Sequence, residues 1–270
     1  MLAEESLRQG NLEESLAELQ QRVRSAPSDP KLRVFLFQLL AVLGQWDRAL
    51  NQLNVSAELD ASTLAMAQTY RTALGCETLR AEVFAGRRSP LVFGEPEPWI
   101  ALLLQAVRQT AEDHHEQARD LRDRAFDAAP AVSGTIEGTP FEWIADADTR
   151  LGPVLEAIVN GAYYWVPFHR IREIRIDAPE DLRDAVWMPA QFTWSNGGET
   201  VGLIPTRYPG SEASTDGGIR LARRTEWLEP SPGAYQGLGQ RMLATDAGEY
   251  PLMDVRRIEI AGAAPGDGDA

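Results

Sequence analysis

The sequence predicts an α+β protein built in two parts. An N-terminal, tetratricopeptide-like helical repeat domain over 1–130 precedes a small, mainly antiparallel β-rich domain over 131–260. Glycine is scarce in 1–130, with five residues, whereas 131–270 holds 17 glycines and five of the seven tryptophans. Glycine-rich turns between short apolar runs are typical of strands joined by tight turns, so the architecture changes near the middle of the chain.

A repeated segment identifies the class of the helical part. Residues 9–16 realign with residues 43–50 at an offset of 34, which is the tetratricopeptide period. In both copies a glycine ends one helix and a small residue lets the next helix cross closely. A weaker third copy has Asp113 in place of the glycine and ends at Pro130. We therefore expect helices over 2–9, 12–25, 30–43, 46–54, 60–86, 97–111 and 114–128.

The helix expected over 30–43 has the clearest signals. Asp29 can cap its first turn and Pro30 suits its first position. Apolar residues recur at spacings of three and four along it, which predicts a buried face. Several prolines between Gly86 and Trp99 predict a loop there.

The second part shows the alternation of strands. We expect a short helix over 151–160 stopped at Gly161, and a helical turn over 179–185. The predicted strands form a small sheet that can close into a barrel. Their ranges are 163–168, 172–177, 187–194, 199–205, 219–227, 238–245 and 251–260. The last residues, 261–270, are glycine, alanine, proline and aspartate, and predict a disordered tail.

Charge narrows the classes of partner. The chain has 26 basic and 40 acidic residues, a formal net charge of −14, which disfavours nucleic acid and anionic membrane surfaces. Only Lys31 is a lysine, so nearly all cations are planar guanidinium groups suited to bidentate pairing with carboxylates. The second part is the more acidic, and we expect it to stay solvated or to meet a basic surface.

Several signals predict a cytoplasmic protein. The first nine residues include two glutamates and lack the basic start and apolar run of a secretory signal. The longest strongly apolar stretch, 34–43, is much shorter than the ~20 residues that span a bilayer. Cys76 is the single cysteine, so no internal disulfide can form, and we expect a small buried side chain there.

Ordered blocks along most of the chain resemble the ImpE/TagJ family, accessory proteins of the bacterial type VI secretion system. The first two blocks are helical and include the Gly44 repeat, while the other four lie in the second part. They are residues 32–40, 43–49, 150–156, 164–168, 204–211 and 237–241.

The resemblance implies a cytoplasmic, non-enzymatic adaptor. It implies binding to the small subunit of the contractile sheath, through the N-terminal helix of that subunit. It also implies a functional link to the ClpV-type AAA+ ATPase that disassembles contracted sheaths. A general peptide-binding scaffold or chaperone without a secretion role is the alternative.

A groove between stacked helix pairs would bind a helix by apolar anchors. The tetratricopeptide resemblance implies that the first helix of each pair lines this groove. The residues expected there are Val34, Gln38, Ala41, Leu103 and Val107. Alternatively, the second part folds into the groove and buries them.

One acidic cluster suggests a competing enzymatic hypothesis. Glu142, Asp146 and Asp148 could supply the paired carboxylates of a hydrolase-like enzyme. Arg150 can instead neutralise one of them in a structural ion pair, which we favour. Such a site requires two of the three carboxylates within catalytic reach in one cleft.

Other candidate sites favour structural interpretations. His114 and His115 are adjacent on a helix and point about 100° apart, so we expect no metal site. His169 lacks a nucleophile motif and is assigned a structural or surface role. No phosphate-binding loop or complete dinucleotide motif occurs, so no cofactor is expected.

Aromatic and basic residues of the second part complete the candidate list. We expect the tryptophans at 165, 187, 194 and 227 to lie in the core. Arg207 and Tyr208 lie in a turn rich in proline and glycine, which predicts exposed side chains that contact a partner. A structural cation–π or ion-pair role is the alternative for both.

Overall fold

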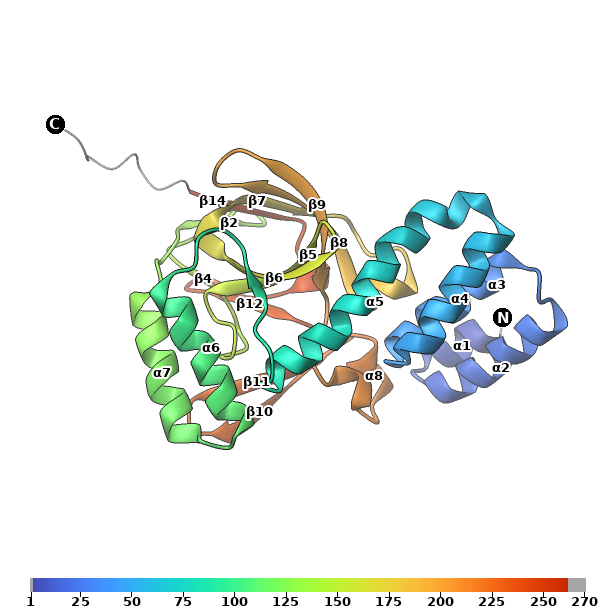
Figure 1. The fold of residues 1–270 in the computed structure, drawn as a ribbon, viewed down its shortest axis with the longest axis horizontal. Coiled ribbons are helices and arrows are strands. Elements are labelled where there is room, and N and C mark those ends of the chain that lie inside the picture. Colours follow the sequence, from blue (N-terminus) through green and yellow to red (C-terminus); the bar gives the residue numbers. More distant parts are fainter. Residues whose placement is uncertain (1, 262–270) are drawn as a thin grey trace.

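The computed structural model describes residues 2–261 and shows helices followed by a mostly antiparallel β-rich region (Figure 1). The change falls between Ala128, where the seventh helix ends, and Gly134, where the second strand begins. The helices before that point are α1 Leu2–Arg8, α2 Leu12–Ser25, α3 Pro30–Val42, α4 Trp46–Leu59, α5 Leu64–Phe84, α6 Pro98–Ala111 and α7 His115–Ala128.

Three helix pairs share one kind of turn. Gly10, Gly44 and Asp113 end α1, α3 and α6 with φ angles of 82°, 68° and 59°. After each of them, the next N–H donates to a carbonyl five residues back, as from Asn11 to Ser6. This is the left-handed C-terminal cap that favours glycine, so Asp113 takes the conformation of the glycine it replaces.

The three pairs are not stacked side by side. The α1/α2 and α3/α4 pairs lie at one end of the molecule, and the α6/α7 pair lies beside the sheets (Figure 1). Helix α5 runs between the two locations. The local turn therefore repeats, while a continuous groove over all three pairs does not form.

Helix α3 begins as the sequence predicts. The Asp29 side chain accepts hydrogen bonds from the N–H groups of Lys31 and Leu32, at 2.9 and 3.3 Å, and Pro30 occupies the first turn. These contacts satisfy two N–H groups that have no partner within the helix.

The β-rich region contains most of the strands. The loop expected between Gly86 and Trp99 contains the first of them, β1 Leu91–Val92. The others are β2 Gly134–Ile136, β3 Thr139–Phe141, β4 Ile144–Asp146, β5 Val154–Val159, β6 Ala162–Pro167, β7 Ile171–Ile176, β8 Trp187–Trp194, β9 Glu199–Pro205, β10 Thr225–Ser231, β11 Ala234–Gly239, β12 Met242–Thr245, β13 Gly248–Pro251 and β14 Arg257–Ile260.

These strands form one large sheet and two small ones. The large sheet has the order β1-β6-β5-β9-β8-β7-β14-β2-β3, and only its β1–β6 pair is parallel. Strands β13, β12 and β4 form a three-stranded sheet, and β10 and β11 form a separate hairpin. The large sheet has free ends at β1 and β3, so the predicted barrel closure is wrong.

Two predicted elements are also wrong. The helix expected over 151–160 is β5, in which every residue is buried, because it pairs with β6 and β9 in the sheet interior. Apolar residues on both faces imitate a helical spacing, and burial on both faces is the physical reason. The strand expected over 219–227 is instead helix α8, Gly217–Arg220, followed by a turn and the start of β10. The predicted helical turn is confirmed at Leu182–Ala185.

The helices and the large sheet share one hydrophobic core. Tyr70 of α5 lies between Phe37 of α3 and Trp187 of β8, with ring centroids 5.8 and 5.7 Å apart. Farther along α5, Phe84 lies 6.0 Å from Trp165 of β6. Helix α5 therefore contacts both parts along its length.

Among the helices of residues 2–261, none is long and apolar enough to cross a membrane. The expected tail, 261–270, lies outside the described residues except for Ala261. The N–H of Ala261 donates to the carbonyl of Ser133 at 2.9 Å.

Candidate functional site

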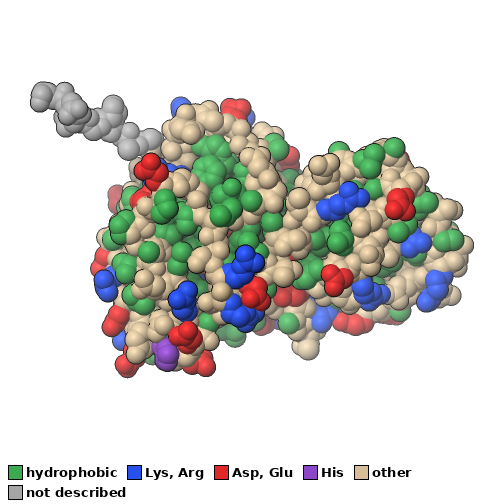
Figure 2. Space-filling view, viewed as in Figure 1, with side chains coloured by type: hydrophobic (Ala, Val, Ile, Leu, Met, Phe, Trp, Pro, Cys, Tyr) green, Lys and Arg blue, Asp and Glu red, His purple; other side chains and the backbone are tan. Residues whose placement is uncertain are grey.

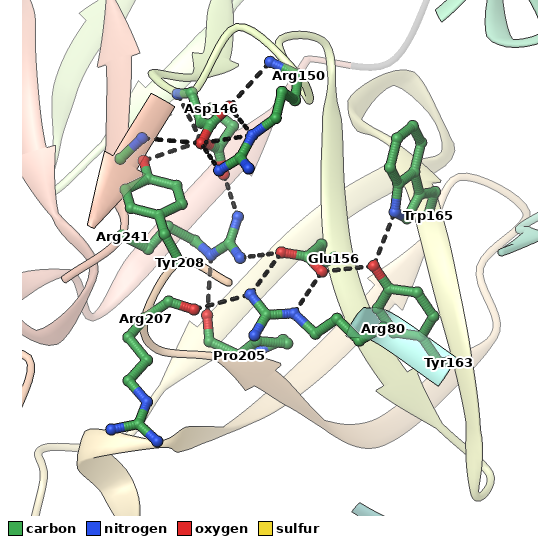
Figure 3. Close-up of polar contacts among 12 residues, drawn as sticks. Arg80, Asp146, Arg150, Glu156, Tyr163, Trp165, Pro205, Arg207, Tyr208 and Arg241 are labelled. Carbon is green, nitrogen blue, oxygen red and sulfur yellow. Dashed lines mark hydrogen bonds and ion pairs between the residues drawn. The ribbon is translucent and has the colours of Figure 1, made fainter. Parts of the chain in front are cut away.

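A buried network of charged residues joins α5 to the sheets (Figure 3). At its centre Glu156 of β5 accepts two hydrogen bonds from Arg80 of α5, at 2.7 and 2.9 Å. Arg241 forms a second ion pair with the same carboxylate. Tyr163 donates to it at 2.5 Å and in turn accepts from the indole of Trp165 at 2.8 Å. Glu156 is fully buried, so these donors replace the water that its charge loses.

The network continues into the small three-stranded sheet. Arg241 also pairs with Asp146 of β4, whose other oxygen accepts from Tyr208 at 3.0 Å. The Asp148 carboxylate pairs with Arg150 at 2.5 Å and accepts from the N–H of Gly237 at 2.9 Å. Pairing each buried charge in this way ties residues distant in the sequence into one arrangement.

Burial and neighbouring charges separate the pKa values of the two central carboxyl groups. Burial opposes ionisation of Glu156, but Arg80 and Arg241 outweigh it and hold its pKa at about 2. For Asp146 burial dominates and raises the pKa to about 6, against the opposing effect of Arg241. Asp146 has one arginine and the nearby Asp148 charge, whereas Glu156 has two arginines, which explains the difference.

The acidic cluster of the hydrolase-like hypothesis is divided in the structure. Asp146 is paired with Arg241, Asp148 is paired with Arg150, and Glu142 is exposed. No two of these three carboxylates are free in one cleft. The ion pair expected between Arg150 and a neighbouring acid is the one to Asp148.

Arg207 and Tyr208 are buried, so their expected exposure is wrong. Arg207 donates to the carbonyls of Val42, at 2.7 Å, and Ala41, at 3.1 Å, at the end of α3. The guanidinium thus gives the Val42 carbonyl a partner at the end of the helix, and the Ala41 carbonyl a second one beside the N–H of Gly44. The ring of Tyr208 lies under Arg241, with 5.3 Å from Cζ to the centroid. Both residues have the structural role that the sequence left as the alternative.

Two of the predicted groove residues line a surface cavity. Val34 and Gln38 of α3 face a cavity of about 390 Å³. The other residues around it come from α1, from the rest of α3, from the corner before α5 and from the turn before β8. They are Glu4, Pro30, Lys31, Phe35, Asp60, Thr63 and Asp181.

The other three groove residues lie elsewhere. Ala41 is buried at the end of α3, where Arg207 reaches its carbonyl. Leu103 and Val107 are buried on α6, beside the sheets and far from α3 (Figure 1). The structure therefore does not bring the five predicted residues into one groove.

The remaining candidates have structural surroundings. The ring of His169 lies 2.8 Å from the Glu97 carboxylate and edge-on to Trp99. Cys76 is buried, and burial raises its pKa to about 11. Within residues 2–261, no group of three or more His, Cys, Asp or Glu side chains is placed to hold a metal ion. On the face in Figure 2, acidic and basic side chains are interspersed between hydrophobic patches.

Arg80, Glu156 and Arg241 were not singled out from the sequence. The one signal was the near absence of lysine, because it predicts bidentate pairing of arginine with carboxylates without saying which pairs form. Burial of β5 was concealed by its helix-like apolar spacing. Arg80 and Glu156 are 76 positions apart, so local patterns could not connect them.

Together these features define a two-part α+β protein whose parts are joined by a buried charge network, with a cavity on its N-terminal helices. The family model described as "ImpE protein" matches residues 138–259. The type VI secretion system accessory component TagJ of Pseudomonas aeruginosa PAO1 is 56% identical over 260 residues, covering 96% of this chain and 91% of TagJ. The chain belongs to the ImpE family.

A solved structure shares the whole architecture. The crystal structure of protein VPA1032 from Vibrio parahaemolyticus superposes with a TM-score of 0.88 at 25% sequence identity. The match covers 97% of this chain and 98% of that one, so it includes both the helices and the sheets.

Proposed function

We propose that this protein is an accessory component of a type VI secretion system. In this proposal it binds the N-terminal helix of the small sheath subunit and modulates disassembly of the sheath by a ClpV-type AAA+ ATPase. The observation that carries the proposal is the cavity on α3 lined by Val34 and Gln38. Family membership and the name of the Pseudomonas aeruginosa relative support the secretion role.

The cavity suits one face of an amphipathic helix. Pro30, Val34 and Phe35 offer apolar surface on one side of α3, where the apolar anchors of a bound helix can lie. Gln38 is nearly buried at the same face and can hydrogen-bond to a polar group of the partner. Contact with apolar side chains at the cavity would supply most of the binding free energy.

Binding to the whole protein tests this proposal. A labelled peptide of the sheath-subunit N-terminal helix is titrated against the wild type and Val34→Asp, and fluorescence anisotropy gives the dissociation constants. We expect Val34→Asp to weaken binding by about tenfold or more, because a buried carboxylate would replace an apolar contact. Val201→Asp, at a position 73% exposed on β9, is the matched control and should bind as the wild type does.

Two outcomes contradict the proposal in different ways. Unchanged affinity in a folded Val34→Asp variant would exclude the α3 cavity as the site. Equal affinity for unrelated amphipathic helices would instead favour the general peptide-binding scaffold or chaperone. The link to the ATPase is tested separately, by the rate at which the ClpV-type enzyme disassembles contracted sheaths with wild type or Val34→Asp.

The proposal places the protein in the cytoplasm and assigns it no reaction of its own. A reducing compartment is compatible with the free thiol of Cys76. The ion pairs of Asp146 with Arg241 and of Asp148 with Arg150 favour a structural role for the acidic cluster.

A further inference from the structure

The hairpin of β10 and β11 exposes large apolar side chains. Trp227 is 38% exposed, Leu228 49% and Tyr235 45%. Trp227 was expected in the core with three other tryptophans, and those three are buried. The difference arises because β10 lies outside the large sheet, and its residues 226–230 are all exposed. Large apolar residues gathered on one exposed element are typical of interaction surfaces.

The outer edge of β10 is open to another strand. The N–H of Gln240 donates to the carbonyl of Arg224, which makes these two residues a hydrogen-bonded pair. Hydrogen-bonded pairs alternate along an antiparallel ladder, so Glu226 and Leu228 also bond to β11. Thr225 and Trp227 therefore direct their N–H and C=O groups away from β11. Within the described residues, no hydrogen bond reaches these groups of Trp227.

The opposite edge of the hairpin is already covered. The N–H of Gly237 donates to Asp148 at 2.9 Å, and the N–H of Tyr208 donates to the carbonyl of Gly239 at 2.9 Å. The hairpin is thus anchored to the buried charge network on one side and unpaired on the other. A strand added from outside can bind only at β10.

The side chain of Trp227 packs against the buried ring of Tyr208. Its ring lies 5.7 Å from the ring of Tyr208, which is itself fixed by hydrogen bonds to Asp146 and the Met242 carbonyl. An aromatic side chain that is already ordered loses little conformational entropy on binding. Tryptophan is also the residue type most enriched among those that dominate interface energies.

The charges along β10 indicate what kind of strand fits. Exposed Glu226 and Glu229 flank Trp227 and Leu228, and the nearest arginine on the hairpin, Arg224, pairs with Glu226. Residues 131–270 carry 12 basic and 21 acidic residues, so the surrounding half of the chain is acidic as well. A second copy would place like charges near one another, which costs free energy. A basic strand would place opposite charges there.

We propose that the outer edge of β10 binds an extended, basic segment of a partner protein, which adds to the hairpin as a third strand. The core of this segment is a basic residue, two apolar residues and a second basic residue. The two apolar residues lie opposite Leu228 and Trp227, and the two basic residues lie opposite Glu229 and Glu226. Main-chain hydrogen bonds provide affinity, and the apolar and basic side chains provide selectivity. This surface is separate from the α3 cavity.

A pair of synthetic peptides tests strand addition directly. Both have a Lys-Val-Ile-Lys core between threonines, and they differ only in which alternate amide nitrogens are methylated. Methyl groups on the edge that faces β10 should abolish binding to the full-length protein, since they remove the donors. Methyl groups on the other edge should leave the affinity unchanged. Equal binding of the two peptides would overturn strand addition.

Protein variants test the side chains. Trp227→Ala should weaken binding by about 30-fold, the effect expected for a central interface tryptophan. Glu226→Lys with Glu229→Lys should abolish binding of the basic peptide and permit binding of its glutamate counterpart. Val34→Asp and Val201→Ala are controls that should bind as the wild type does. Unchanged affinity in folded Trp227→Ala, or no preference for the basic peptide, would overturn the proposal.

A second copy of the chain is the competing occupant. Analytical ultracentrifugation of the wild type and Trp227→Ala distinguishes self-association from binding of a partner. A wild-type dimer that dissociates in Trp227→Ala would assign the β10 edge to self-association and overturn the proposal. A monomer that binds the basic peptide supports it. Loss of sheath-helix binding in Val34→Asp with intact basic-peptide binding would show that the two surfaces act independently.

Discussion

The guanidinium of Arg207 donates to the carbonyl of Val42 across 2.7 Å, although the two residues are 165 positions apart. A residue just after β9, in the β-rich region, thereby completes the hydrogen bonding at the end of helix α3. Arg207 also donates to the carbonyl of Arg220, the last residue of α8, and burial lowers the pKa of Arg207 to about 10. At neutral pH the guanidinium of Arg207 therefore remains charged, and carbonyl oxygens stabilise its charge by accepting hydrogen bonds.

Arg207→Ala should lower the free energy of unfolding by about 2–4 kcal/mol, because hydrogen bonds from a buried charged donor to several carbonyls are lost. The free energy of unfolding of Arg207→Lys should lie between those of Arg207→Ala and the wild type, since one ammonium group cannot reproduce the hydrogen bonds of the planar guanidinium. Urea unfolding followed by circular dichroism measures both. A loss below about 0.5 kcal/mol for Arg207→Ala would contradict the capping role, as that is typical of surface changes.

Glu156→Gln should be among the most damaging polar substitutions. Removing the central carboxylate leaves Arg80 and Arg241 without their shared partner, which typically costs about 3–5 kcal/mol for a buried pair. The pKa of Glu156 in the folded protein, about 2, lies below the ordinary value of 4.5. Its contribution to stability is therefore present above pH 4.5 and is lost as the pH falls toward 2.

Unfolding free energies measured between pH 7 and pH 2.5 test this pH dependence. The wild type should lose more stability over that range than Glu156→Gln, because the variant has no carboxyl group to protonate at this position. Parallel curves for the two proteins would exclude Glu156 as a source of the acid sensitivity.

Asp146→Asn should lower the free energy of unfolding less than Glu156→Gln does. The pKa of Asp146 is raised from 3.8 to about 6, so the folded protein holds that proton more tightly than the unfolded chain does. Its titration therefore favours the fold below pH 3.8, and this contribution is lost as the pH rises through 6. Asparagine removes the burial cost of the charge, and Arg241 keeps its pair with Glu156. A larger loss of stability in Asp146→Asn at pH 7 would contradict this order.

Leu103→Asp and Val34→Asp should separate folding from binding. Leu103 is fully buried on α6, so an aspartate there should lower the unfolding free energy by at least about 3 kcal/mol. Val34 is half-buried at the cavity, so Val34→Asp should remain folded and lose only helix binding. Thermal unfolding and peptide titration of the same samples measure both. A stable Leu103→Asp protein would contradict its placement in the core.

Two substitutions of glycine by alanine should change the free energy of unfolding in opposite directions. Gly75 is exposed within α5 and a Cβ there meets no atom within 4 Å, so Gly75→Ala should stabilise the protein by about 0.5–1 kcal/mol. A Cβ on Gly237 would lie 2.1 Å from Cδ2 of Tyr208, so Gly237→Ala should destabilise it by about 1–3 kcal/mol. The second change should also alter the near-ultraviolet circular dichroism of Trp227, whose ring lies against Tyr208. The same sign for both variants would contradict the packing described.

The helices could be predicted from the sequence because their signals are local. Asp29 and Pro30 define the start of α3, and Gly10 and Gly44 define turns, through contacts within a few residues. The main difference among them is α4, which continues to Leu59 beyond the expected end at residue 54. The strands of the β-rich region were harder to predict. Whether 151–160 forms a strand depends on its burial between β6 and β9, and these contacts leave no signal in the local sequence pattern.

The candidate site was predicted in part for the same reason. Val34 and Gln38 were expected on one helix face, and the cavity includes both. Leu103 and Val107 were assigned to the same groove through the repeat, yet α6 lies beside the sheets, a matter of long-range packing. Arg207 and Tyr208 lie in a turn that looks exposed, and the contacts that bury them come from 13 to 166 positions away.

Helix α5 has a mechanical consequence. Its 21 residues make a rod roughly 30 Å long, with Tyr70 in its first half and Phe84 at its C-terminal end. Pulling α5 away from the sheets would break the ion pair between Arg80 and Glu156 of β5 and expose both charges. The protein should therefore behave as a stiff spacer, which transmits load between objects bound at its two ends and keeps their separation constant.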